Sequence, residues 1–131
     1  MIRSRRGSQA VEFALAVPFL FGIVSSVVDL AEYLNINDAL VAAVASGARS
    51  GALVEKSSGK DPLVVAHDTA TTSWGVSLVR GTPTFGVVYS GQTPDRLLVL
   101  SGSVPFDPLF GFLPLPNAIT HSSTVLTVIQ P

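Results

Sequence analysis

The sequence contains no cysteine and only two histidines among its 131 residues. The absence of cysteine excludes disulfide scaffolds, thiolate metal sites, thiol catalysis and iron–sulfur clusters. Charged residues are also scarce, at 13% of the chain against about 25% in an average soluble domain. The net charge of −1 means that the chain lacks the excess of positive charge that binding to nucleic acid requires. These shortages argue against an enzyme and against a nucleic-acid-binding protein, and we expect no cofactor and no metal.

Apolar sequence is concentrated near the N-terminus instead. Residues 13–28 (FALAVPFLFGIVSSVV) form a run of sixteen residues without charge between Glu12 and Asp29. As a helix this run spans about 24 Å, against about 30 Å for the hydrocarbon core of a bilayer. The next residues extend it, with Asp29 and Glu32 near the interface. Pro18 lies inside the run and is expected to bend or loosen the helix.

The flank that precedes this run is basic. Arg3, Arg5 and Arg6 stand there, and nothing acidic occurs before Glu12. A basic flank predicts a cytoplasmic N-terminus, with the rest of the chain across the membrane. Three interpretations compete, namely a cleaved secretory signal, a plain membrane anchor and a pilin-type N-terminus. Residues 24–26 would serve as a signal cleavage site, but a signal peptide has no use for an acid such as Glu12 directly before its apolar run.

The helical pattern continues well past the apolar run. Apolar and small residues recur at spacings of three and four to about Leu53, which predicts one helix of about 45 residues. Ala39, Ala43 and Gly47 lie four apart on one face, where another backbone could approach closely. They would pack against a neighbouring rod or seat the chain's own C-terminal part, and the two uses are compatible. The recurring residues are Tyr33, Ile36, Leu40, Ala43, Val44 and Gly47.

The remaining sequence predicts an α+β head. Asp61 followed by Pro62 is a good helix start, and the helix should run to about Leu78. Alternating apolar residues then indicate three strands, and we expect an antiparallel sheet packed on this helix and on the end of the rod. The expected helix stripe is Leu63, Ala66, Ala70, Trp74 and Leu78, with Trp74 in the core. The expected strands are residues 84–90, 96–106 and 119–129.

The segment between the last two strands, residues 107–117, is unusually apolar for a loop. It carries three prolines and the apolar residues of the stretch 109–115. Such a loop would be an interaction surface or would fold back over the open face of the sheet, and the second use is favoured.

Candidates for metal chemistry are few. His67 and Asp68 are neighbours on a predicted helix, so their side chains are expected to diverge. His121 lies in a Ser/Thr-rich strand with no third ligand in view, whereas a metal site needs three or four convergent ligands.

A processing signature marks the boundary between the basic and the apolar segments. The basic segment ends in Gly7, and Ser8 follows. Glu12 stands five residues beyond the glycine, with Phe13 directly after it. A carboxylate at the edge of hydrocarbon is costly unless it is paired. The pattern resembles the site of type IV prepilin peptidase, with cleavage between Gly7 and Ser8, and the Glu-Phe pair resembles that of the Flp and tight-adherence (Tad) pilin class.

The sequence resembles the TadE-like family of pseudopilins in three segments. They are residues 10–18 (AVEFALAVP), the end of the rod at residues 47–49 (GAR), and residues 104–114. Phe13 stands where the family pattern has tyrosine. The resemblance implies a minor pilin or pseudopilin that helps to build a Tad pilus for surface adhesion. It also implies that Glu12 of one subunit neutralises the new amino terminus at Ser8 of its neighbour. The implied partners are prepilin peptidase, other pilin or pseudopilin subunits, the assembly platform and inner-membrane lipid.

The sequence thus predicts a leader at residues 1–7, a transmembrane and rod helix at 8–53, and an α+β head at 54–131. Cleavage would change the net charge from −1 to −4. The expected location is the bacterial inner membrane, with a cytoplasmic N-terminus and a periplasmic head, and then the pilus or cell surface, as a homo- or hetero-oligomer through the N-terminal helix. The alternative is a permanently anchored envelope protein with a small external binding head.

Overall fold

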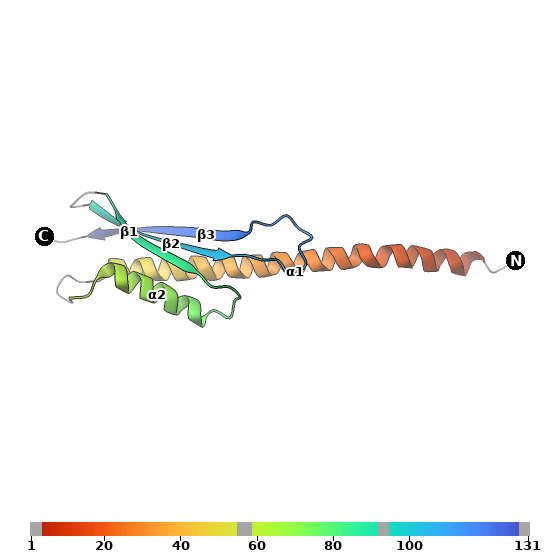
Figure 1. Ribbon diagram of the computed structural model, residues 1–131, viewed down its shortest axis with the longest axis horizontal. Helices are drawn as coiled ribbons and strands as arrows, with labels where there is room; N and C mark the ends of the chain where they lie inside the picture. Colours follow the sequence, from red (N-terminus) through yellow and green to blue (C-terminus); the bar gives the residue numbers. More distant parts are fainter. Residues whose placement is uncertain (1–3, 55–58, 92–94, 129–131) are drawn as a thin grey trace. The chain divides into compact units, whose positions relative to one another are not determined.

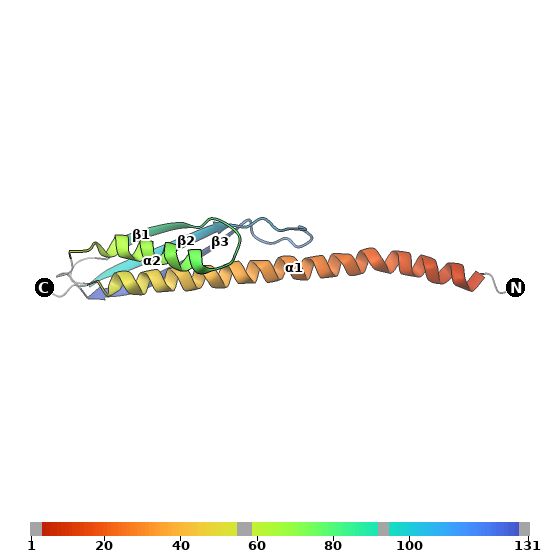
Figure 2. The ribbon, with the colours of Figure 1, turned by 90° about the horizontal axis from the view of Figure 1, so that it is seen from below.

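The computed structural model describes residues 4–54, 59–91 and 95–128. The elements follow in the order α1 (Ser4–Ala52), α2 (Pro62–Val76), β1 (Thr84–Ser90), β2 (Asp95–Pro105) and β3 (Ala118–Val128) (Figure 1). Helix α1 continues through Pro18 without interruption (Figure 2). The predicted fold class, an α+β chain with a long apolar N-terminal helix, a shorter helix and a three-stranded sheet, is confirmed.

The chain forms two compact units, and α1 contributes to both. The N-terminal unit combines α1 up to Tyr33 with the loop Asp107–Leu115. The head unit takes Leu34–Phe106 and the chain from Pro116 onward, so it includes the last third of α1. The predicted boundaries of leader, rod and head stay predictions.

Helix α2 begins as the sequence predicts and ends earlier. The Asp61 side chain accepts a hydrogen bond from the backbone N–H of Leu63 at 2.9 Å, and Pro62 occupies the first turn. The helix ends at Val76 because Ser77 is extended and donates its N–H to Trp74 O. Leu78 therefore lies beyond the helix and is fully exposed, so its expected place on the apolar stripe was wrong.

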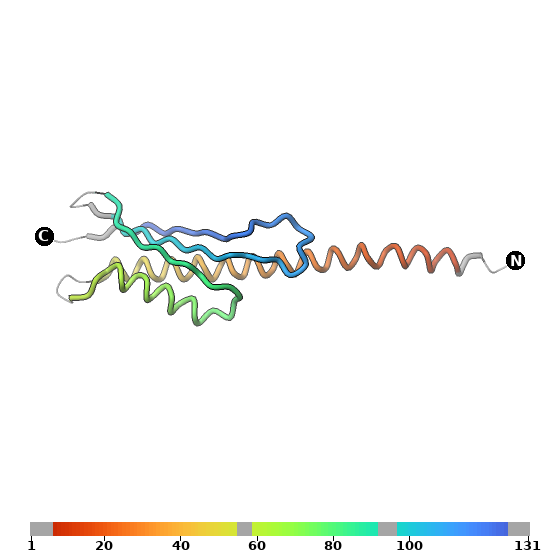
Figure 3. Tube along the Cα trace, viewed as in Figure 1, coloured from red at the N-terminus to blue at the C-terminus, as the bar shows by residue number. Residues whose placement is uncertain are grey.

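The three strands form an antiparallel meander in the order β1-β2-β3 (Figure 3). The central strand β2 supplies most of the sheet's buried residues, with Leu98, Leu100 and Val104 fully buried on one face, and Ile119 of β3 adds to them. The spacing of two or four residues along β2 is that of one face of a strand. The strand ends agree with the prediction to within a residue. Ile129 and parts of the predicted link 55–61 and turn 91–95 lie outside the described residues.

The core of the head lies between the sheet and the two helices. Ile36, Leu40 and Val44 are buried along α1, as the three- and four-residue spacing predicts. Trp74 is only 7% exposed, which confirms it as a core residue of α2. The fold thus covers one face of the last third of α1.

Candidate functional site

The residues of the predicted processing site lie on one short stretch near the start of α1. Gly7, Ser8, Glu12 and Phe13 are all exposed. Ser8 Oγ donates a hydrogen bond to Glu12 Oε1 at 3.3 Å, one helical turn away. A Cβ added at Gly7 would have open space around it. The described fold therefore leaves the Gly7–Ser8 bond and the Glu12 carboxylate open to a partner.

The leader arginines are described less fully. Arg5 and Arg6 have helical backbone in α1, which begins at Ser4. Their side chains and the whole of Arg3 lie outside the described structure. The Gly7–Ser8 bond therefore lies within helical backbone.

The apolar run of α1 is left largely uncovered by the rest of the chain. Phe13 and Leu15 are each 71% exposed, and Phe19 is 79% exposed. The stretch Gly7–Ala52 contains a span that is long and apolar enough to cross a membrane, with a mean hydropathy of 2.1 and only 6% of its residues buried. Burial of this much apolar surface in lipid is favourable, whereas its exposure to water is costly.

The small residues of α1 differ in their surroundings. Ala43 and Gly47 are buried inside the head unit, and Ala39 is half-buried. A Cβ at Gly47 would stand 2.7 Å from Leu100 Cδ2 and 2.8 Å from Ala70 Cβ. Of the two predicted uses, the geometry supports seating of the chain's own head, and packing against another subunit stays a prediction.

The loop Asp107–Leu115 is tied to α1 through Asp29. The carboxylate accepts hydrogen bonds from the N–H of Phe110 at 3.1 Å and from the N–H of Gly111 at 2.9 Å. Gly111 adopts a φ of +69°, a conformation that glycine tolerates best. The Phe110 ring stands edge-on to Phe21, with 6.0 Å between the ring centroids. The prediction that this loop covers the sheet is wrong, because its backbone and its aromatic ring pack within the N-terminal unit.

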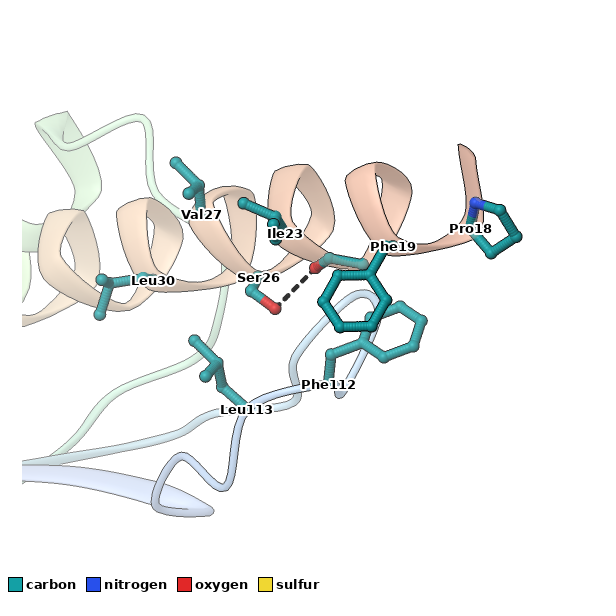
Figure 4. Close-up of a pocket in the computed structure, with 9 residues that line it drawn as sticks. Pro18, Phe19, Ile23, Ser26, Val27, Leu30, Phe112 and Leu113 are labelled. Carbon is teal, nitrogen blue, oxygen red and sulfur yellow. Dashed lines mark hydrogen bonds between the residues drawn. The ribbon is translucent and has the colours of Figure 1, made fainter. Parts of the chain in front are cut away.

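A groove of about 450 Å³ lies between the loop and the helix. Figure 4 shows α1 side chains along one wall and Phe112 and Leu113 of the loop on the other. Its one polar side chain, Ser26, donates its hydroxyl to the carbonyl of Gly22 at 2.7 Å, so the groove presents an apolar surface. The lining residues are Pro18, Phe19, Gly22, Ile23, Ser26, Val27, Leu30, Phe112 and Leu113.

Asp29 has a role that the sequence analysis did not predict. Its expected place near the membrane interface stays a prediction, and the structure shows that its side chain is completely buried. A signal was present, because an acid that ends an uncharged helical run needs donors if it is not solvated. The apolar segment 108–115 contains a single glycine whose neighbouring amides could supply those donors. Nothing in the local spacing links residues 29 and 111, so the pairing depended on tertiary structure.

The predicted divergence of His67 and Asp68 is also wrong. His67 Nδ1 lies 3.6 Å from Asp68 Oδ1, with both side chains at least half exposed. Free rotation at the helix surface allows such adjacent side chains to approach. Among the residues that the structure describes, no three histidine or acidic side chains gather as a metal site would require.

Comparison with protein families gives a match that lies within α1. A family model of TadE-like proteins matches residues 7–49, from the predicted cleavage point almost to the end of α1. The resemblance drawn from the sequence is confirmed over this stretch. The likeness of the tail segment 104–114 lies outside the match and stays a prediction. No curated protein and no solved structure matches the chain.

Proposed function

From an N-terminal helix that is TadE-like over residues 7–49, we propose that the chain is a minor pilin or pseudopilin of the Tad pilus. It is synthesised with a leader of residues 1–7, held in the inner membrane by α1 and cut between Gly7 and Ser8 by prepilin peptidase. The mature subunit, with residues 54–131 as its periplasmic head, then enters or supports a filament that serves surface adhesion. The proposed role is structural, with no catalytic step.

The observation that carries this proposal is that the two ends of α1 differ in their exposure. The last third of the helix is seated in the head, whereas the apolar run before it is largely exposed, and Gly7–Ala52 contains a span that is long and apolar enough to cross a membrane. A helix of this kind can move from lipid to the apolar surfaces of neighbouring helices without refolding the head. A plain anchor would not need the processing signature that starts the matched stretch.

Glu12 and Phe13 are proposed to act in assembly. Cleavage would place a new α-ammonium at Ser8, and the exposed Glu12 carboxylate of a neighbouring subunit would neutralise it. The pair would be partly desolvated among apolar helices, so loss of one partner would cost more than at an ordinary surface. Phe13, 71% exposed, would add apolar contact beside the pair.

The variant Gly7→Leu tests the processing site. We expect it to lower the processed fraction at least about tenfold, because a peptidase pocket shaped for glycine discriminates strongly by size. The fold should be unaffected, since a Cβ added at Gly7 has open space around it and residue 7 is exposed. The intact mass of the protein recovered from membranes measures the fraction that has lost residues 1–7.

Gly75→Leu is the matched control, because Gly75 is also exposed, helical and free of neighbours within 4 Å of an added Cβ. The control should be processed like the unaltered chain. Equal processing of the Gly7 and Gly75 variants would argue against the proposed cleavage site and favour a permanently anchored envelope protein.

A further inference from the structure

We propose that the loop Asp107–Leu115 is a second membrane element, which enters the outer leaflet beside α1 and contacts the lipid acyl chains. Its exposed large apolar side chains are Leu109, Phe110 and Phe112, which are 57%, 41% and 58% exposed, and its one charged residue, Asp107, stands at its start. No charged residue occurs between Pro108 and Ile119. This inference rests on the membrane insertion of α1 proposed above.

The position of the loop along the helix sets its depth. Asp29 binds the loop backbone at the end of the uncharged run, and Phe21 contacts the loop ring within the run. Eight residues separate the two positions, so the contacts of Phe110 alone reach points on α1 that are about 12 Å apart along its axis. Half of a hydrocarbon core is about 15 Å thick. With residues 13–28 in the bilayer, the loop tip therefore lies at the level of acyl chains.

Two backbone N–H groups of the loop have an acceptor within the protein, which contact with lipid requires. Irregular backbone at membrane depth is tolerated where it is buried against protein, and its polar groups need partners there. The amides of Phe110 and Gly111 both donate to the Asp29 carboxylate, and this carboxylate is completely buried. The same contact removes an exposed charge from the helix and two free donors from the loop.

Lipid also explains the groove between the loop and the helix. Its walls are apolar, and its helix wall includes Ile23 and Val27, which are more than half exposed. In water, the groove and the exposed Phe19 and Phe112 that line it would be apolar surface of the kind that soluble proteins rarely expose in large patches. An acyl chain of the surrounding leaflet fits this groove because both the acyl chain and the groove walls are apolar.

Single-cysteine variants of the full chain test the proposal, since the natural sequence has no cysteine. Leu15→Cys, Leu109→Cys, Phe112→Cys and Val88→Cys would each carry an NBD fluorophore in phosphatidylcholine–phosphatidylglycerol vesicles. Val88 of β1 is the matched control, because it is 58% exposed like Phe112 but belongs to the head unit. Leu15 reports on the insertion of α1 itself. Each emission is compared between ordinary lipid and lipid brominated on its acyl chains.

We expect blue-shifted emission and a loss of intensity in brominated lipid at Leu109 and Phe112, as at Leu15, and neither change at Val88. If Leu15 is quenched while Leu109 and Phe112 behave like Val88, the loop is in water and the inference is wrong. Loop labels that are shielded from water but unquenched by brominated lipid would assign the patch to a second copy of the chain and also overturn it. An unquenched Leu15 would contradict the membrane insertion of α1.

Discussion

Gly47→Ala is expected to destabilise the head by about 1–3 kcal/mol, although alanine is the better helix former. The added Cβ would stand 2.7 Å from Leu100 Cδ2 and 2.8 Å from Ala70 Cβ. It would also meet the backbone carbonyl of Ala66, which cannot yield without shifting α2. Thermal unfolding of the full chain in detergent, followed by the fluorescence of Trp74, should show a fall in Tm of at least about 5 °C.

Gly75→Ala is the matched control for this experiment. An added Cβ there meets nothing within 4 Å, so the helix propensity of alanine should leave stability unchanged or raise it by up to about 1 kcal/mol. Trp74 is the chain's single tryptophan and is buried in the head, so its emission reports the unfolding of this unit. A Gly47 variant as stable as the Gly75 variant would contradict the seating of α1 against α2 and β2.

Asp29→Ala is expected to release the loop from the helix. The substitution leaves the amides of Phe110 and Gly111 without their acceptor, and a hydrogen bond to a charged group contributes about 1.5–3 kcal/mol. Since about 1.4 kcal/mol corresponds to a factor of ten, these two amides should exchange with solvent deuterium about 10 to 100 times faster. Hydrogen exchange of the detergent-solubilised chain, read on peptides that span residues 107–115, measures the change.

Asp38→Ala serves as the control, because Asp38 is an exposed acid on the same helix. Asp29→Asn should fall between the two, since an amide keeps one oxygen that can accept a hydrogen bond. The exchange of the β2–β3 amides should be alike in all three variants. Unchanged exchange at residues 107–115 in Asp29→Ala would show that the carboxylate does not hold the loop.

The elements were predictable because their signals are local. The buried face of α1 follows from the spacing of Ile36, Leu40 and Val44, and the start of α2 follows from Asp61 and Pro62. The strands follow from alternation in short apolar segments. The family resemblance, drawn from a few residues around Gly7 and Glu12, is matched over residues 7–49.

The loop was not predictable by such reasoning. Its apolar residues predicted an interaction surface or a cover over the sheet, but the sequence does not say which element the loop contacts. In the structure, the N–H of Gly111 donates a hydrogen bond to the Asp29 carboxylate, and no local sequence period connects these two residues. The missed exposure of Leu78 has a similar origin, because the stripe of α2 gives no sign that Ser77 ends the helix.

The mass of the N-terminal peptide tests the central claim most directly. The peptide would be recovered from membranes of cells with and without prepilin peptidase. A peptide that starts at Ser8 only in the presence of the peptidase is the predicted result. A chain that still starts at Met1 in both strains, or one cut near Ser26, would contradict the account and leave Glu12 as a simple interfacial charge.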